Sequence, residues 1–226
     1  MKKQEPQNEP VQSQPQHTGV VSPYTPAPMP SSSQGLEYLC QVSQMQIQIR
    51  SPFLLYCRRI IYDIKNSVGQ QVYTVTEDFN CPYQYFCMGV RSFTRRMTDN
   101  TGGLVMEVHK PFECPILSCC LKSETIDVKS ASGEPMAYIV KGSNQFLLTL
   151  KILNENKDEV LNITATQCFN FFEAHLKVTN VQEKMVVGMI TIKENYSSKT
   201  YDVHFALDLD VKMKAAILAT CLLFDV

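Results

Sequence analysis

Cysteine is the residue type whose spacing in this chain most invites a chemical interpretation. The sequence contains nine cysteines, and five of them form two groups, Cys81 with Cys87 and Cys114 with Cys119 and Cys120. The first four of these residues could be imagined as zinc ligands, but their spacing fits no common zinc site, so we expect no zinc. The odd number of cysteines, their irregular spacing and the lack of an apolar leader favour a reducing compartment over a secreted disulfide scaffold. Buried small hydrophobic residues, the usual role of free cysteines, are the alternative interpretation.

Other chemistry is poorly supported by the sequence. The four histidines, His17, His109, His175 and His204, lie in unrelated contexts. The chain has no nucleophile elbow, zinc-protease motif or phosphate-binding loop, so we expect no enzyme that makes or breaks covalent bonds. The formal net charge is −1, and a nucleic-acid partner is therefore not expected.

Residues 1–34 are rich in Pro, Gln and Ser and contain few apolar residues. Such a segment cannot bury a core, so we expect a disordered tail followed by one domain over residues 35–226. Within the tail, Pro23 and Pro26 have the PxxP spacing that SH3-type domains recognise. A solvated spacer is the alternative.

A repeated hairpin pattern dominates the rest of the chain. Leu36–Leu39 is expected to form a short helix or turn before a first strand. Five times an alternating apolar run then meets a polar turn and resumes, and Asn, Asp, Ser and Gly suit the backbone of tight hairpin turns. The five turns are Asn66–Gly69, Asp99–Gly103, Ser130–Gly133, Asn154–Asp158 and Asn180–Glu183. Together with a last strand, this pattern predicts about twelve antiparallel strands.

The final strand and helix are predicted from a change of period near the C-terminus. Apolar residues alternate from Val203 to Met213, which indicates a half-buried strand. From Ala215 to Phe224 nearly every residue is apolar or small, which indicates a helix over about 212–225 with no wet face. The apolar members of this helix are Ile217, Leu218, Cys221, Leu222, Leu223 and Phe224.

The number of strands suggests what encloses this helix. A long antiparallel sheet avoids open edges by closing, and a barrel of about twelve strands is too wide for its own side chains to fill. We therefore predict an all-β fold with one central helix: a closed antiparallel barrel around the C-terminal hydrophobic α-helix. A membrane span is the alternative role for the helix, although a span needs about 20 apolar residues.

Three segments carry a resemblance to a known family. Gly35-Leu-Glu-Tyr-Leu39, the block from Tyr62 to Asp78 and the string Leu207-Asp-Leu-Asp-Val-Lys-Met-Lys-Ala215 resemble the phospholipid scramblase family. The resemblance implies a tubby-like, twelve-stranded barrel. It also implies calcium-dependent, ATP-independent movement of phospholipids between the leaflets of a membrane. A membrane-tethered interaction module without scrambling activity is the alternative function.

The family's calcium segment corresponds to the twelve residues from Ser197 to Asp208. In the family pattern, acids stand at the first, third and last positions. Here the first position is Ser197 and the third is Lys199, while Asp208 keeps the last acid and Asp202 lies between them. Calcium requires several oxygen ligands, so losing two carboxylates and gaining an ammonium group should weaken binding. Calcium is expected from the resemblance alone, with Asp202, Asp208 and Ser197 as the remaining ligands.

The resemblance also implies thioacylation of clustered cysteines. The candidates are Cys119 and Cys120, followed by Cys114, Cys87 and Cys81. Two acyl chains anchor a protein stably where one does not. We therefore expect a location on the cytosolic face of a membrane, the plasma membrane, through acylation and the C-terminal helix.

Basic residues give little further signal. The stretch Gly188–Lys199, where the family carries nuclear import signals, contains only Lys193 and Lys199. The doublets Arg58-Arg59 and Arg95-Arg96 are typical of solvated strand ends. By analogy with tubby-like domains, phosphoinositide head groups are an alternative ligand for these doublets.

Overall fold

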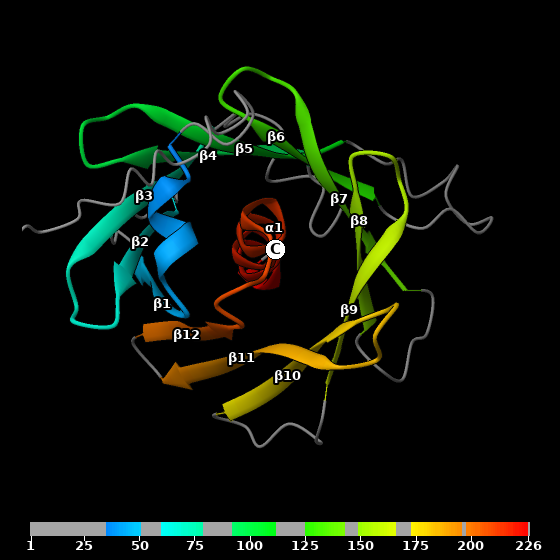
Figure 1. Cartoon of the computed structure of the whole chain (residues 1–226). Helices are drawn as coiled ribbons and strands as arrows, with labels where there is room; N and C mark the ends of the chain where they lie inside the picture. The colour runs from blue at the N-terminus through cyan, green and yellow to red at the C-terminus, as the bar shows by residue number, and fades with distance from the viewer. Residues whose placement is uncertain are drawn as a thin grey trace, which may run out of the picture.

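Twelve antiparallel strands form a closed barrel around one helix (Figure 1). The computed structural model describes residues 35–50, 60–78, 92–111, 125–142, 149–165, 173–195 and 198–225. The predicted tail, with Pro23 and Pro26, lies outside the described residues. Each strand pairs with its neighbours in the sequence, and β1 closes the barrel by pairing with β12.

The element bounds follow the predicted hairpins closely. A 3-10 helix, η2, spans Glu37–Gln41, where the sequence predicts a helix or turn. The strands are β1 (Gln44–Arg50), β2 (Ile61–Asn66), β3 (Gln71–Glu77), β4 (Phe93–Asp99), β5 (Leu104–Lys110), β6 (Thr125–Ser130), β7 (Pro135–Lys141), β8 (Thr149–Asn154), β9 (Glu159–Ala165), β10 (Glu173–Asn180), β11 (Val186–Asn195) and β12 (Ser198–Phe205). All five predicted turns connect consecutive strands, from β2–β3 to β10–β11.

The five hairpin turns share one construction. In the first, the side-chain oxygen of Asn66 accepts hydrogen bonds from the backbone N–H groups of Val68 and Gln70. Asp99, Ser130, Asn154 and Asn180 do the same in the other four turns. A residue with positive φ completes each turn: Gly69, Gly102, Gly133, Lys157 and Lys184. These short side chains hold the turn by bonding to its own backbone, which is why the sequence predicts the turns well.

The strand predicted from Val203 to Met213 is wrong in its second half. β12 ends at Phe205, and the residues after it form a turn in which the N–H of Leu209 donates to the carbonyl of Ala206. The Asp210 carboxylate then accepts hydrogen bonds from the N–H groups of Lys212 and Met213. This N-cap starts the helix α1 at Val211, so capping outweighs the period-2 pattern that continues through Leu207 and Leu209.

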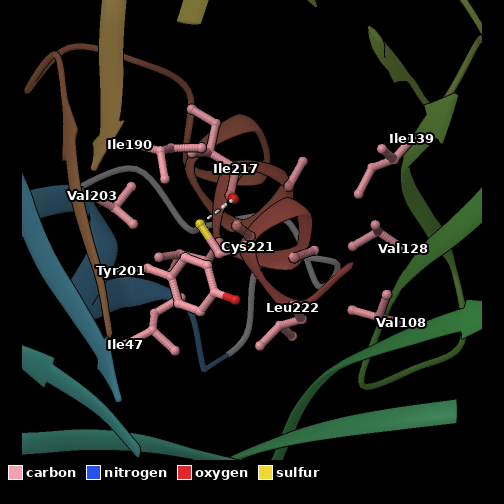
Figure 2. Packing of buried hydrophobic residues seen from close by; sticks show 14 of the residues in the cluster. Ile47, Val108, Val128, Ile139, Ile190, Tyr201, Val203, Ile217, Cys221 and Leu222 are labelled. Carbon is pink, nitrogen blue, oxygen red and sulfur yellow. Dashed lines mark hydrogen bonds between the residues drawn. The ribbon is translucent and has the colours of Figure 1, made fainter. Parts of the chain in front are cut away.

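The C-terminal helix lies inside the barrel, as the fold prediction states. α1 spans Val211–Cys221 and continues as a 3-10 helix, η4 (Leu222–Asp225). Every residue of α1 from Met213 to Cys221 is buried. Figure 2 shows Ile217, Cys221 and Leu222 with Tyr201 and Val203 of β12 on one side and Val128 and Ile139 of the opposite wall on the other. The predicted class, a closed twelve-stranded barrel around a hydrophobic helix, is confirmed.

Candidate functional site

The two ends of the barrel differ in what they contain. β12 leads through the turn 206–210 directly into α1, so the five hairpin turns and the start of the helix lie at one end. We call this the Lys214 end, after the buried lysine there. The opposite end, where the helical segment reaches Phe224, is called the Phe224 end. Strands β3 and β5 finish at this second end, at Glu77 and Lys110.

Lys214 is a charged residue in the first turns of an otherwise apolar helix, and it is completely buried. Its Nζ donates to the backbone carbonyls of Leu39, Val42 and Leu207 at 3.0, 3.1 and 2.8 Å. It also lies 5.3 Å from the centre of the Phe205 ring. Burial lowers the pKa of the Lys214 ammonium below its ordinary value of 10.5. The three acceptors come from η2, the segment before β1 and the turn after β12. One side chain therefore joins the helix to the segments that flank the first and the last strand of the barrel.

Lys199 ties the helical segment at the other end. Its Nζ donates to the carbonyl of Phe224 at 3.1 Å and lies 5.7 Å from the centre of the Tyr201 ring. The Tyr201 and Phe224 rings stack with centroids 6.2 Å apart. An ammonium group at the end of a helix stabilises the unpaired carbonyls and the negative end of the helix dipole. Lys199 therefore has a structural partner at the position where the family's calcium pattern has an acid.

The predicted calcium segment is mostly a strand. β12 covers Ser198–Phe205 and pairs with β1 and β11 along its length. Ser197 lies outside the described residues, and Asp208 is exposed in the turn before α1. An extended strand turns alternate side chains to opposite faces, so its residues cannot wrap around an ion as a loop does.

The Asp202 carboxylate is already engaged on the outer face of the barrel. Its oxygens accept hydrogen bonds from Gln46 Nε2 at 2.8 Å and Lys193 Nζ at 2.8 Å. Burial alone would raise the pKa of the Asp202 carboxyl, but these two hydrogen bonds and the Lys193 charge hold that pKa below its ordinary value. Asp202, Asp208 and Lys199 as placed here do not fit a calcium site. Among the described residues, no group of three or more His, Cys, Asp or Glu side chains is arranged to hold a metal ion.

Four exposed apolar side chains lie on two adjoining segments at the Lys214 end, the start of β11 with its preceding turn and the turn after β12, and we call them the apolar corner: Met185, Val186, Met189 and Leu207. They are 63%, 51%, 43% and 60% exposed, respectively. The corner is held together because Ala206 N–H donates to the Val187 carbonyl, which joins the turn before α1 to the start of β11. Exposed apolar groups that cluster in this way mark surfaces that contact another molecule or a membrane.

Three functional side chains are missed by the sequence analysis. The sequence does not predict acceptors for Lys214 or a helix-end role for Lys199. The prediction that the Arg95-Arg96 doublet is a solvated strand end is wrong for Arg95, which is completely buried, because its place in β4 turns it into the barrel. A signal was present: Phe93, Arg95 and Met97 alternate with Thr94 and Arg96, so Arg95 shares the apolar face of the strand.

All five cysteine candidates, Cys81, Cys87, Cys114, Cys119 and Cys120, lie outside the described residues, so their acylation stays a prediction. Arg58 and Arg59 lie outside them too. Cys221 is buried, and its Sγ donates to the carbonyl of Ile217 at 3.5 Å (Figure 2). This residue has the small-hydrophobe role that free cysteines usually take.

The family model and the similar curated proteins all point to one protein family. A family model described as Scramblase matches residues 22–226. The chain belongs to the phospholipid scramblase family. Phospholipid scramblase 2 of Bos taurus is 34% identical over 237 residues, covering 96% of this chain and 80% of the relative. Phospholipid scramblase 1 of Mus musculus is 33% identical and covers 96% of this chain and 72% of its own length. Phospholipid scramblase family member 5 of Homo sapiens is 30% identical, with 88% and 80% covered. No solved structure matches the chain.

Because the family acts on membranes, the position of the C-terminal helical segment, inside the barrel or across a bilayer, matters for function. In the part of the chain that the structure describes, no helix combines the length and apolarity needed to cross a bilayer. The apolar members of the helical segment, from Ile217 to Leu222, are buried against the barrel wall, and Leu223 and Phe224 are partly buried. For a member of the scramblase family, the helical segment is therefore an internal element tied by a lysine at each end.

Proposed function

We propose that the protein moves phospholipids between the two leaflets of a bilayer without ATP hydrolysis or covalent chemistry. The single observation that carries this proposal is the match to the phospholipid scramblase family over residues 22–226. Transport of this kind requires no nucleophile or acid–base pair. It requires a polar path for head groups through the hydrocarbon layer.

The position of α1 inside the barrel limits how the protein could move phospholipids. A barrel that keeps α1 inside presents no polar path, so we propose that the helical segment leaves the barrel, at least in part, during transport. Leaving would break the three hydrogen bonds of Lys214 and the Lys199 contact with Phe224. The apolar corner supports bilayer contact beside the same turn, because Leu207 carries both an exposed side chain and one of the Lys214 acceptors.

Attachment to the cytosolic face of the plasma membrane through acyl chains belongs to the same proposal. Cys119 and Cys120 are the first candidates, followed by Cys114, Cys87 and Cys81. Acyl-exchange labelling of the natural protein and of a Cys119→Ser, Cys120→Ser double variant tests this part. Equal labelling of both proteins would contradict these two sites.

We also propose that the segment with Pro23 and Pro26 binds an SH3-type domain. A Pro23→Ala, Pro26→Ala variant should fail to bind that domain.

Calcium regulation through Ser197–Asp208 is a separate proposal, and we propose that this segment binds calcium only weakly. The support is the Lys193 and Gln46 contacts that occupy Asp202 and the ammonium group at position 199. Isothermal titration calorimetry of the natural protein against a Ser197→Asp, Lys199→Asp variant tests it. Micromolar binding by the natural protein would contradict the proposal.

A second function is favoured by the lysine contacts at both ends of the helical segment. A barrel that never releases its helix would serve as a membrane-tethered interaction module without scrambling activity. Liposomes that carry labelled phospholipid in both leaflets separate the two functions. The transport proposal expects inner-leaflet label to become accessible to a membrane-impermeant quencher faster than in empty liposomes, with calcium and with a chelator. Rates equal to empty liposomes under both conditions would leave the module as the function.

A further inference from the structure

A second buried cation lies inside the barrel at the Phe224 end. Arg95 is on the inward face of β4, and its side chain is 0% exposed. The next residue, Arg96, points outward, with 44% of its side chain exposed, and forms surface ion pairs with Asp78 and Glu107. Two adjacent arginines therefore face two different environments, one inside the barrel and one in water.

The partners of Arg95 satisfy only part of its guanidinium group. Its Nε donates to Glu77 Oε2 at 2.8 Å. Nη2 lies 2.7 Å from the same oxygen, an ion-pair distance, but without the alignment of a hydrogen bond. Within the described residues, neither Nη1 nor Nη2 has a hydrogen-bond partner. A buried donor without an acceptor has lost its hydration without compensation, and the cost is larger when the group is charged.

Aromatic rings lie beside the same guanidinium group. Its Cζ is 4.2 Å from the centre of the Phe93 ring and 5.2 Å from the centre of the Tyr62 ring. Such contacts favour a cation and restrict where it can move. The contacts with Phe93 and Tyr62 are made by the ring faces, which supply no hydrogen-bond acceptor in the plane of the guanidinium. Nη1 and Nη2 of Arg95 therefore still lack oxygen acceptors.

A second buried cation lies near Arg95 among the described residues. Glu77 pairs with Arg95 across β3 and β4, and Phe93 pairs with Lys110 across β4 and β5. Lys110 is buried, on the inward face with Met106 and Val108. Arg95 and Lys110 are thus two cations near the outermost inward-facing layer, because Glu77 and Lys110 are the last residues of their strands.

We propose that Arg95, together with Lys110, binds a phosphate group at the Phe224 end of the barrel interior. A guanidinium presents its N–H donors in a planar fork that matches the oxygens of phosphate, and an ammonium adds a point charge. The phosphate belongs either to a phospholipid head group or to a soluble ion. The lipid source rests on the proposed function, whereas phosphate binding itself does not depend on transport.

Binding is tested on the full chain in solution by titration calorimetry and thermal unfolding. The probes are inorganic phosphate, with sodium chloride at equal ionic strength as reference, and dihexanoyl phosphatidic acid below its micelle concentration, with dihexanoyl glycerol as reference. We expect one phosphate-containing probe or both to bind and raise Tm, while chloride and the glycerol lipid do not. Binding of inorganic phosphate alone assigns a soluble ion, and binding of the short lipid alone assigns a head group. No binding of either probe would overturn the proposal.

Adjacent arginines supply the matched control. Arg95→Leu is expected to weaken phosphate binding roughly tenfold to hundredfold, the value of one or two charge-assisted hydrogen bonds. Arg96→Leu removes the same charge from the outer face and should leave the Kd unchanged. Equal weakening by both variants would indicate a general charge effect and would overturn the site.

Glu77→Gln gives a result in the opposite direction and does not depend on Arg95→Leu folding well. Removing the carboxylate charge removes the anion that competes with the ligand for the Arg95 guanidinium, so we expect about tenfold tighter phosphate binding. Unchanged or weaker binding in folded Glu77→Gln protein would contradict the proposal. A natural protein that binds phosphate but moves no lipid in liposomes would keep this site and reject only the transport function.

Discussion

Two completely buried cations, one at each end of the barrel, are held in different ways. Lys214 meets three carbonyl oxygens, which matches the three donors of an ammonium group. Arg95 meets one carboxylate and keeps two nitrogens without hydrogen-bond partners in the described residues. Full satisfaction is typical of a group that holds a fold together, whereas partial satisfaction is typical of a group that awaits a ligand.

The difference also concerns what each cation connects. The Lys214 acceptors belong to segments that are far apart in the sequence, so its contacts hold the helix to the closed sheet. The Arg95 partner is the directly opposite residue on the neighbouring strand, and that pair adds nothing to closure that the strand hydrogen bonds do not already provide. The following experiments break or sharpen this comparison, in order of decreasing effect.

A further interior cation should be intolerable where no acceptor is near. Leu218→Lys places an ammonium group in the middle of α1, at a position with 0% exposure. The cost of an unpaired buried charge is comparable to the whole stability of a domain, about 5 kcal/mol or more. We expect loss of the cooperative thermal transition by circular dichroism, with Leu218→Met as the folded control. A folded Leu218→Lys barrel that only loses membrane association would support a membrane-spanning role for the helix.

Removing the satisfied cation should be the next largest effect. Lys214→Met leaves three carbonyls without their donor, so we expect a loss of about 3 kcal/mol in the free energy of unfolding, measured with urea. Lys212→Met is the matched control, because Lys212 Nζ forms a surface ion pair with Glu155 and is not among the buried residues of α1. Its loss should be about 0.5 kcal/mol or less. Similar losses for both variants would show that the Lys214 contacts do not hold the helix.

Removing the partly satisfied cation should cost less. Replacing Arg95 by Leu and Glu77 by Gln together removes one good hydrogen bond and two buried nitrogens without partners, and it leaves no buried carboxylate without its cation, so we expect about 1 kcal/mol of destabilisation. The urea midpoints of this double variant and of Lys214→Met should therefore differ clearly. A loss in the double variant as large as in Lys214→Met would mean that both cations are structural.

Alkaline pH should change the contribution of Lys214 in a defined direction. Burial lowers the pKa of this group in the folded state, while the unfolded chain keeps a value near 10.5. Between these two values the unfolded state binds more protons, so the stability of the natural protein relative to Lys214→Met rises as pH increases toward 10.5. Urea unfolding of both proteins at several alkaline pH values measures the difference. A difference that shrinks with pH would contradict the sign of this shift.

The smallest effect on stability is expected at the apolar corner. Leu207→Ser changes an exposed side chain, so the free energy of unfolding should change by about 0.5 kcal/mol or less. Binding to liposomes in a flotation assay should nevertheless fall if the corner contacts lipid. Val68→Ser, at an exposed position in the β2–β3 turn at the same end but outside the corner, is the control and should bind as the natural protein does. Equal flotation of both variants would remove the corner from the membrane contact.

Much of this fold is local and was predictable from the sequence. The hairpin turns depend on residues such as Asn66 and Asp99 that bond to their own backbone, and the interior helix follows from the width of a twelve-stranded barrel. The end of β12 was not predictable from periodicity, because the Asp210 cap depends on where the chain turns. The acceptors of Lys214 come from residues up to 175 positions away, and no local pattern contains them. The inward direction of Arg95 could have been read from its alternation with Phe93 and Met97.

Closure of the barrel by its first and last strands has a consequence for synthesis. β1 cannot pair with β12 until both exist, and the pairing joins positions as distant as 44 and 204. At typical rates of translation, the strands made first wait roughly ten to thirty seconds for this partner. The helix that fills the interior is made later still. Nascent chains therefore expose an open sheet edge and an apolar concave face throughout that time, so chaperone demand during translation should be high even though the finished barrel has no free edge.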